Sequence, residues 1–223
     1  PPPPSGPVMG TGLSWVTYFS QRDRFGFDTR FIGGVPTLFD VVADDGSSII
    51  ESGAGDDTVL TGNGADIAQL GPGIDFALGM ADDDAIFGGD SNDQIGGDGP
   101  HTDLIPGFTD TPGPLHGRDF LAGEGGNDVL LGHGNDDVLY GGNGDDRIYG
   151  DEDSVSFTPV EFHGADYIDG GEGSDVAVGG GSDDIVLGGD GDDLLWGDDL
   201  ATVVPEFNQG SDHLEGGNGN DQL

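Results

Sequence analysis

The sequence predicts an all-β fold built from short repeats, and three observations carry that prediction. A nine-residue unit recurs from Ser52 to the last residue, it keeps an aspartate and an apolar residue at fixed places, and 46 of the 223 residues are glycine. A period of nine is too short for helical solenoids. It suits a tight loop of about six residues followed by a strand of about three.

The copies can be aligned by placing the aspartate at position six and the apolar residue at position eight, as in GGNGDDRIY (141–149). Copies then start at residues 52, 61, 70, 79, 88, 97, 123, 132, 141, 150, 170, 179, 188, 197 and 216. Position six is always aspartate: Asp57, Asp66, Asp75, Asp84, Asp93, Asp119, Asp128, Asp137, Asp146, Asp166, Asp175, Asp184, Asp193, Asp212 and Asp221. Position eight is always apolar: Val59, Ala68, Ala77, Ile86, Ile95, Leu121, Leu130, Leu139, Ile148, Ile168, Ala177, Val186, Leu195, Leu214 and Leu223.

The spacing indicates what these two positions do. Residues two apart on a strand point to the same side, so the aspartate and the apolar residue should both face inward. Glycine at positions one, two and four permits a tight, left-handed or close-packed loop, and Asp82, Ser91, Asn135 and Ser182 stand in for it at position four. Stacked loops then offer carboxylate and carbonyl oxygens, a donor set typical of Ca²⁺. The bland alternative is that Asp and Gly only shape turns.

The unit resembles the G-G-x-G-x-D-x-U-x nonapeptide of the RTX (repeats-in-toxin) family, over residues 52–223. The resemblance implies a right-handed parallel β-roll, a β-solenoid in which two nonapeptides make one coil and Ca²⁺ lies between successive loops of one edge. It allows up to about thirteen ions. The implied metal-binding residues are the fifteen aspartates above and loop glycines of the later copies. Those glycines are Gly123, Gly125, Gly141, Gly142, Gly144, Gly170, Gly171, Gly173, Gly188, Gly189, Gly191, Gly216, Gly217 and Gly219.

The pattern is weakest between residues 52 and 78. These copies begin with Ser52, Thr61 and Leu70 in place of glycine, and Ala65 and Ile74 occupy position five. Calcium sites are therefore expected more firmly from residue 123 onward than in the first coils.

Three copies are interrupted after a Gly-Asp pair, by segments 99–116, 152–163 and 199–209. They are even-numbered copies, so in a coil of two nonapeptides all three insert loops should leave from one edge. Each insert carries proline and apolar residues. The inserts could fold back over the roll, or they could form a row of contacts for a partner or a neighbouring copy.

Positions seven and nine should point outward and are often apolar, for example Phe76 with Leu78 and Val176 with Val178. An isolated roll would then show apolar patches that soluble monomers rarely leave uncovered. The inserts, the first fifty residues or another chain could cover them. Residues 1–51 lack the repeat and are expected to be a linker and a cap for the roll, or the tail of a preceding domain. Within them, 43–51 resembles a degenerate first coil.

Composition excludes several function classes. With 44 acidic residues against 5 basic ones, the net charge is −39, so nucleic acid and anionic membrane surfaces are poor partners. Such a charge would normally indicate disorder, but the strict period favours a fold neutralised by bound cations. There is no cysteine, no apolar run of membrane-spanning length and no signal segment, and both ends resemble cuts in a longer polypeptide.

No catalytic motif was found, and no enzyme is expected. H-E-x-x-H and G-x-S-x-G are both missing from the sequence. Pairs such as Asp56-Asp57 repeat too often to be one acid–base site. His116 and His163 each precede the glycine that resumes a copy. A lone loop histidine is usually solvated or hydrogen-bonded, and a zinc site is not expected.

The sequence thus predicts a calcium-binding structural β-roll of a secreted or surface-exposed bacterial RTX protein. By resemblance, it would leave the cell unfolded by type I secretion and fold outside on Ca²⁺ binding, as a surface-layer, filament or adhesin module. The alternative is the secretion and folding module of an RTX enzyme or toxin whose catalytic domain lies outside this sequence. A third hypothesis is a calcium-regulated binding surface built from the inserts.

Overall fold

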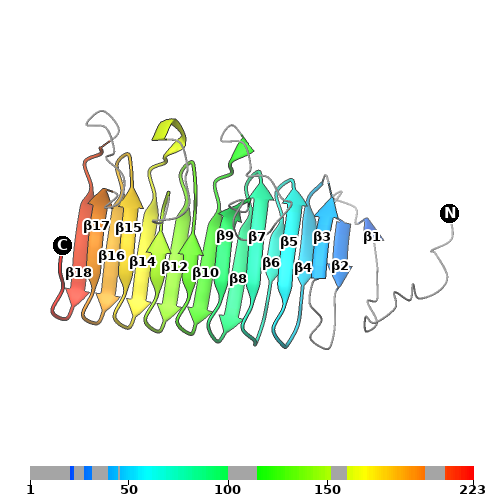
Figure 1. The fold of residues 1–223 in the computed structure, drawn as a ribbon, viewed down its shortest axis with the longest axis horizontal. Coiled ribbons are helices and arrows are strands. Elements are labelled where there is room, and N and C mark those ends of the chain that lie inside the picture. Colours follow the sequence, from blue (N-terminus) through cyan, green and yellow to red (C-terminus); the bar gives the residue numbers. More distant parts are fainter. Residues whose placement is uncertain are drawn as a thin grey trace.

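The chain forms two parallel β-sheets that stack coil upon coil along one axis (Figure 1). The computed structural model describes residues 21–22, 28–31, 40–44, 46–99, 115–151, 160–198 and 209–223. Sheet A contains, in spatial order, β1 (Gln21–Arg22), β2 (Asp28–Phe31), β4 (Ser48–Glu51), β6 (Ile67–Gln69), β8 (Ala85–Asp90), β10 (Phe120–Gly125), β12 (Val138–Asn143), β14 (Tyr167–Glu172), β16 (Ile185–Asp190) and β18 (His213–Asn218). Sheet B contains β3 (Asp40–Asp44), β5 (Thr58–Asn63), β7 (Phe76–Ala81), β9 (Gln94–Asp98), β11 (Val129–Leu131), β13 (Arg147–Tyr149), β15 (Val176–Gly180) and β17 (Leu194–Asp198).

The predicted parallel β-roll is confirmed. Successive strands alternate between the sheets, so each nonapeptide supplies one strand and two make a coil. All pairings are parallel except that of β1 with β2. Among the described residues the helical structure is limited to short 3₁₀ turns such as η2 (Val160–Phe162), and no helix could span a membrane.

The parallel ladders begin upstream of Ser52. Strand β3 pairs with β5, and β4 pairs with β6 in a register that places Ile50 opposite Ala68. Ile50 is fully buried, as expected for position eight of a degenerate first coil. Position six of that coil is Ser48, which has no carboxylate. Most of residues 1–39 lie outside the described residues, so the cap predicted there stays a prediction.

Three connections from sheet B to sheet A contain extra residues. In uninterrupted coils the residues that pair are 18 apart, whereas Asp84 and Asp119 are 35 apart, Asp137 and Asp166 are 29 apart, and Asp184 and Asp212 are 28 apart. The register after each interruption is the same as before it. The predicted inserts themselves (99–116, 152–163 and 199–209) fall largely outside the described residues.

The core is a single file of side chains between the sheets, formed by the position-eight residues together with Leu70 from position one. Ile86, Leu121 and Leu139 come from sheet A, Leu130 and Ile148 from sheet B, and all are fully buried. Burying each such side chain contributes roughly 1.5–3 kcal/mol. The prediction that position eight faces inward holds along the file, except that Leu214 is only partly buried and Leu223 is 67 % exposed.

Some apolar residues of the outer faces are buried, whereas others, such as Tyr140 and Ile185, are exposed. Leu78 and Val178, at position nine of sheet B, are only 3 % and 4 % exposed. Leu78 lies over Gly96, whose missing side chain leaves room for it, and Val178 lies between Tyr149 and Trp196 in the ladder.

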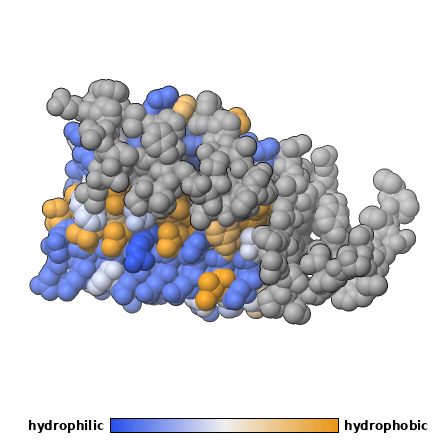
Figure 2. Space-filling view, in the orientation of Figure 1, coloured by the Kyte–Doolittle hydropathy of each residue, from blue (hydrophilic) through white to orange (hydrophobic). Residues whose placement is uncertain are grey.

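Sheet A carries a run of aromatic rings on its outer face. Phe87, Phe120, Tyr140 and Tyr167 have successive centroids 5.5, 5.6 and 5.8 Å apart. In Figure 2 hydrophobic residues form a band along the face turned to the viewer. Apolar packing along these faces therefore adds to the single-file core.

Candidate metal-binding loops

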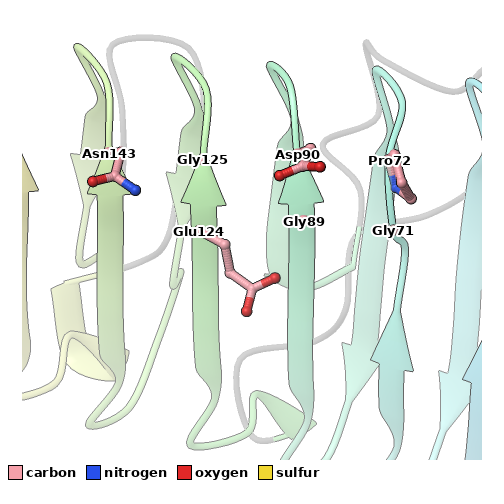
Figure 3. A pocket seen from close by; sticks show the side chains of 7 residues that line it. All are labelled: Gly71, Pro72, Gly89, Asp90, Glu124, Gly125 and Asn143. Atoms are coloured by element: carbon pink, nitrogen blue, oxygen red, sulfur yellow. The ribbon is translucent and has the colours of Figure 1, made fainter.

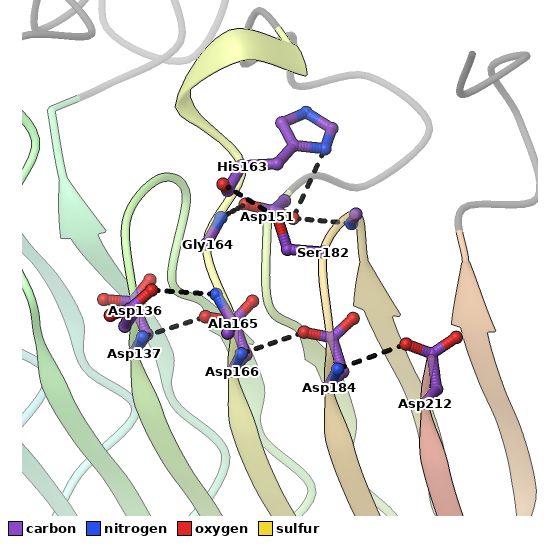
Figure 4. A network of polar contacts seen from close by, with 11 residues as sticks. Asp136, Asp137, Asp151, His163, Gly164, Ala165, Asp166, Ser182, Asp184 and Asp212 are labelled. Atoms are coloured by element: carbon purple, nitrogen blue, oxygen red, sulfur yellow. Dashed lines mark hydrogen bonds and ion pairs between the residues drawn. The ribbon is translucent and has the colours of Figure 1, made fainter. Parts of the chain in front are cut away.

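The position-six aspartates form two ladders, one on each edge of the roll. In each ladder Oδ1 accepts the backbone N–H of the aspartate one coil earlier: Asp128 N donates to Asp146 at 2.8 Å, and Asp146 N donates to Asp175 at 2.8 Å. On the other edge Asp137, Asp166, Asp184 and Asp212 form the same chain (Figure 4). The structure therefore explains why position six is always aspartate from residue 57 onward.

Position five carries a second ladder that runs in the opposite direction. There the carboxylate accepts the N–H of position five one coil later, as Asp145 does from Ser174 N at 2.9 Å and Asp136 from Ala165 N at 3.0 Å. These side chains are exposed, whereas the position-six carboxylates are buried. The Asp-Asp pairs of successive coils thus form two hydrogen-bonded rows, an exposed row at position five and a buried row at position six.

The second oxygen of the buried carboxylates is left without a hydrogen-bond donor. Among the described residues this holds for Oδ2 of Asp57, Asp75, Asp84, Asp93, Asp119, Asp128, Asp137, Asp146, Asp166, Asp175, Asp184 and Asp193. An unpaired buried carboxylate oxygen is costly, so a row of them calls for protons or cations.

The surroundings of these oxygens are also acceptors. A Cβ added to Gly141 would meet both Asp146 Oδ2 and, at 2.5 Å, the carbonyl oxygen of Gly170 in the next coil. In the other copies an equivalent pair, the Oδ2 of position six and the carbonyl oxygen of position one in the next coil, lies beside Gly170, Gly179 and Gly188. Position one is therefore glycine because of close approach, and it brings a carboxylate and a carbonyl oxygen together without a donor between them.

Positions two and four are glycine for a different reason. Gly142 and Gly144 have φ values of 111° and 129°, in the left-handed region. The predicted stand-ins at position four share it: Asp82, Ser91, Asn135 and Ser182 have φ between 71° and 89°. Position two also holds left-handed Met80, Glu124 and His133, which the sequence reading did not single out.

The loop carbonyls of one coil point at the next coil. A Cβ on Gly171 would collide with Gly142 O, and one on Gly173 with Gly144 O. The same relation joins Gly189 to Gly171, Gly191 to Gly173, Gly217 to Gly189 and Gly219 to Gly191. Gly125 is different, since the nearest atom to its added Cβ is Gly89 O at 3.8 Å. Gly126, at position four of that copy and absent from the predicted set, has the left-handed φ of 143°.

The first two copies fill the space differently. Ser52 Oγ donates to the carbonyl of Leu70 at 2.7 Å, and Thr61 Oγ1 donates to Gly79 O. Burial raises the pKa of Asp57, and the Ser52 hydroxyl offsets part of that rise. A hydroxyl hydrogen thus lies where later copies bring two acceptors together. This gives a physical reason to expect weaker calcium sites there.

Burial raises the pKa of these carboxyl groups, and the two edges differ. On the edge that leads from sheet B to sheet A, burial together with nearby carboxylates raises the pKa of Asp84 and Asp184 to about 9. On the other edge burial raises the pKa of Asp75 and Asp175 to about 6. On the first edge the pKa is raised further by carboxylates at position two of the interrupted copies: Asp98 acts on Asp137, and Asp198 acts on Asp184.

Neither the side chains alone nor the groove on the surface forms a metal centre of the usual kind. No cluster of three or more His, Cys, Asp or Glu side chains that could hold a metal occurs in the described part of the chain, so a cation here would depend on backbone oxygens. A groove of about 450 Å³ runs along the loops from sheet A to sheet B (Figure 3). Its lining residues, Gly71, Pro72, Gly89, Asp90, Glu124, Gly125 and Asn143, are all at least partly exposed.

Of the two settings expected for the histidines before the resuming glycines, solvated or hydrogen-bonded, the structure excludes the solvated one. The side chain of His163 is fully buried, with Nδ1 3.3 Å from Asp151 Oδ2, and that of His116 is 7 % exposed, with Nδ1 3.6 Å from Asp98 Oδ2. The sequence analysis did not pair these residues, although each pair brackets an insert.

Comparison with known proteins places the repeats in a family. A family model described as the RTX calcium-binding nonapeptide repeat (4 copies) matches residues 40–68, 70–99, 117–148, 164–195 and 208–223, more than half of the chain. No curated protein and no solved structure matches the chain.

Proposed function

Because the chain belongs to the RTX calcium-binding nonapeptide repeat family, we propose that its loops bind Ca²⁺ through the position-six carboxylates and that this binding drives folding. The observation that carries the proposal is the row of buried Oδ2 atoms that face carbonyl oxygens with no donor between them. Oxygen-only surroundings of this kind suit Ca²⁺.

The residues that would hold the ions are the aspartates from Asp75 to Asp221, with carbonyl oxygens of the loop glycines. On the edge from sheet A to sheet B, Asp146 Oδ2 and Gly170 O are one such pair. Calcium would supply the positive charge that the buried carboxylates lack, and up to about thirteen ions fit the loop count.

A repeat-based calcium-binding roll is a structural rather than a catalytic domain. We propose that this one serves a secreted or surface-exposed bacterial protein, as a rigid module of a surface layer, filament or adhesin. The family and the net charge of −39 support this, since such a chain would stay unfolded at low calcium and fold where calcium is plentiful.

A calcium titration followed by circular dichroism and light scattering tests the proposal. The chain in a chelator should show little β structure and should gain it on adding CaCl₂ but not equimolar MgCl₂. A gain of structure with growing particle size supports an assembling module, whereas a gain without growth supports a monomeric one. A chain that is equally folded in chelator and in calcium contradicts the proposal.

A further inference from the structure

The interrupted copies close their loops with a side chain that other copies do not have. Each has aspartate at position two, and its carboxylate accepts the N–H of the glycine that resumes the copy. Gly164 N donates to Asp151 Oδ1 at 2.9 Å, and Gly117 N donates to Asp98 Oδ1 at 3.1 Å. The third copy repeats the contact between Gly210 N and Asp198. The two ends of each interruption are thus held together in one way.

The same carboxylate also reaches the next coil. Gly181 N donates to Asp151 Oδ2 at 2.8 Å, and Gly134 N donates to Asp98. Gly181 and Gly134 both occupy position three of the following copy on that edge. In ordinary loops an added Cβ at position two meets a backbone carbonyl of the previous coil, but at Gly180 it meets Asp151 Oδ2. The aspartate side chain therefore lies where other loops place a carbonyl oxygen.

An imidazole lies beside this carboxylate in two of the three copies. His163 and Asp151 are both fully buried, 3.3 Å apart (Figure 4). His116 and Asp98 form the equivalent pair and are nearly as buried. In the third copy the equivalent residue is Gln209.

The neighbouring coils hold the histidine backbone in place. Asn135 Nδ2 donates to His116 O at 2.7 Å, and Ser182 Oγ donates to His163 O at 3.3 Å. Both donors are the left-handed, non-glycine residues of position four. The His116 ring also lies 6.3 Å from that of Phe162, which precedes the second histidine. The two pairs are thus part of a contact set repeated along the edge.

We propose that the Asp98–His116 and Asp151–His163 pairs are clasps that hold the two ends of each interruption together, and that the carboxylates of Asp98 and Asp151, which accept backbone N–H groups, are not calcium ligands. The inference rests on the proposed function, because it separates these position-two carboxylates from the position-six carboxylates of the same copies, Asp119 and Asp166, which would hold Ca²⁺. Its consequence is that the ends of the inserts stay fixed on the roll by side chains of the chain itself.

The test compares removal of a pair with removal of a ladder aspartate at saturating calcium. Asp151→Asn combined with His163→Asn should leave the number of Ca²⁺ bound per chain unchanged, whereas Asp146→Asn should lower it by at least one, as measured by equilibrium dialysis. In the double variant, hydrogen exchange at the amides of Gly164 and Gly181 should be at least about tenfold faster. His213→Asn is the matched control, since His213 is exposed and lies 4.0 Å from Glu215. It should change neither measurement.

A variant that adds a contact, rather than removing one, tests the inference without the risk that the chain fails to fold. Gln209→His should add a third pair with Asp198 and slow exchange at the amide of Gly210. Loss of a calcium ion in the Asp151/His163 double variant would overturn the proposal. So would Co²⁺ or Zn²⁺ uptake at saturating calcium that disappears in His163→Asn, because the imidazole would then be a metal ligand. If the unaltered chain binds no Ca²⁺, the proposed function fails, while the exchange measurements still decide this inference.

Discussion

The backbone N–H of Asp128 donates to Oδ1 of Asp146, one coil further along the roll, at 2.8 Å. One carboxylate oxygen is therefore engaged between coils while the other is buried beside Gly170 O. The two oxygens thus differ in role: Oδ1 joins neighbouring coils by a hydrogen bond, and the charge on Oδ2 has to be balanced by a cation or a proton. Four predictions follow from this division and from the packing around it.

Replacing Asp146 by alanine should reduce both stability and calcium binding. The substitution removes a charge-assisted hydrogen bond worth about 1.5–3 kcal/mol and one carboxylate of the loop. Its matched control is Asp145→Ala, because Asp145 is exposed and lies outside the buried row. Thermal unfolding at saturating calcium and a calcium titration measure the two effects. Equal losses for the two variants would show that the buried row has no special role.

Gly141→Ala should be destabilising by about 1–3 kcal/mol, because its Cβ would collide with Asp146 Oδ2 and Gly170 O. Gly125→Ala is the matched control, since its Cβ would have nothing nearer than Gly89 O at 3.8 Å. Denaturant unfolding of both variants in calcium tests the difference. A Gly141 variant as stable as the Gly125 variant would contradict the close approach described for position one.

Without calcium, acid should stabilise the roll. A carboxyl group whose pKa is raised on folding stabilises the fold below its unfolded pKa and loses that contribution as the pH rises through its folded pKa. Burial raises the pKa of Asp75 to about 6 and those of Asp84 and Asp184 to about 9. In chelator, β structure should therefore decrease as the pH rises from 6 to 9.

At saturating calcium the trend should reverse on the acid side, because protons compete with the ion for the same oxygens. Circular dichroism across this pH range, with and without calcium, measures both trends. A calcium-free chain that gains structure as the pH rises would show that the aspartates are not buried in the folded state.

Leu139→Ala should cost about 2–5 kcal/mol, as expected for a large side chain removed from a fully buried file. Leu223→Ala is the control at the same repeat position and should stay within about 0.5 kcal/mol, since Leu223 is 67 % exposed. Chemical unfolding at saturating calcium compares the two. A small effect at Leu139 would mean that the outer faces rather than the single-file core carry the stability.

The sequence predicted the inward positions and the loop backbone, because both follow from the period. The parallel β-roll was predicted from the resemblance to the RTX nonapeptide. The left-handed backbone at Asn135 and Ser182 follows from their place in the nonapeptide. Burial of Leu78 could not be predicted in this way, because it depends on Gly96 in the neighbouring coil. The Asp151–His163 pair was missed for a similar reason, since its members lie at opposite ends of an insert and meet only when the coil closes.

Glu124 illustrates the remaining limit. A left-handed glutamate at position two, with φ of 71°, is unfavourable on local grounds alone. The ladder imposes that backbone, since Glu124 pairs in register with Gly89 and Gly142 on its two sides. Coil-to-coil register thus overrides the preference of a single residue.

The residues paired across the three interruptions are 35, 29 and 28 apart in sequence, yet the register of the strands is unchanged. The pairing of the coils is therefore independent of the length of the inserted segment. The roll should therefore accept inserted segments at these three points. A foreign peptide or a small domain placed between Asp151 and His163 would enter and leave at a closed seam, and the coils on either side would keep their pairing. Segments at these points are free to diversify in length and sequence while the scaffold beneath them stays the same.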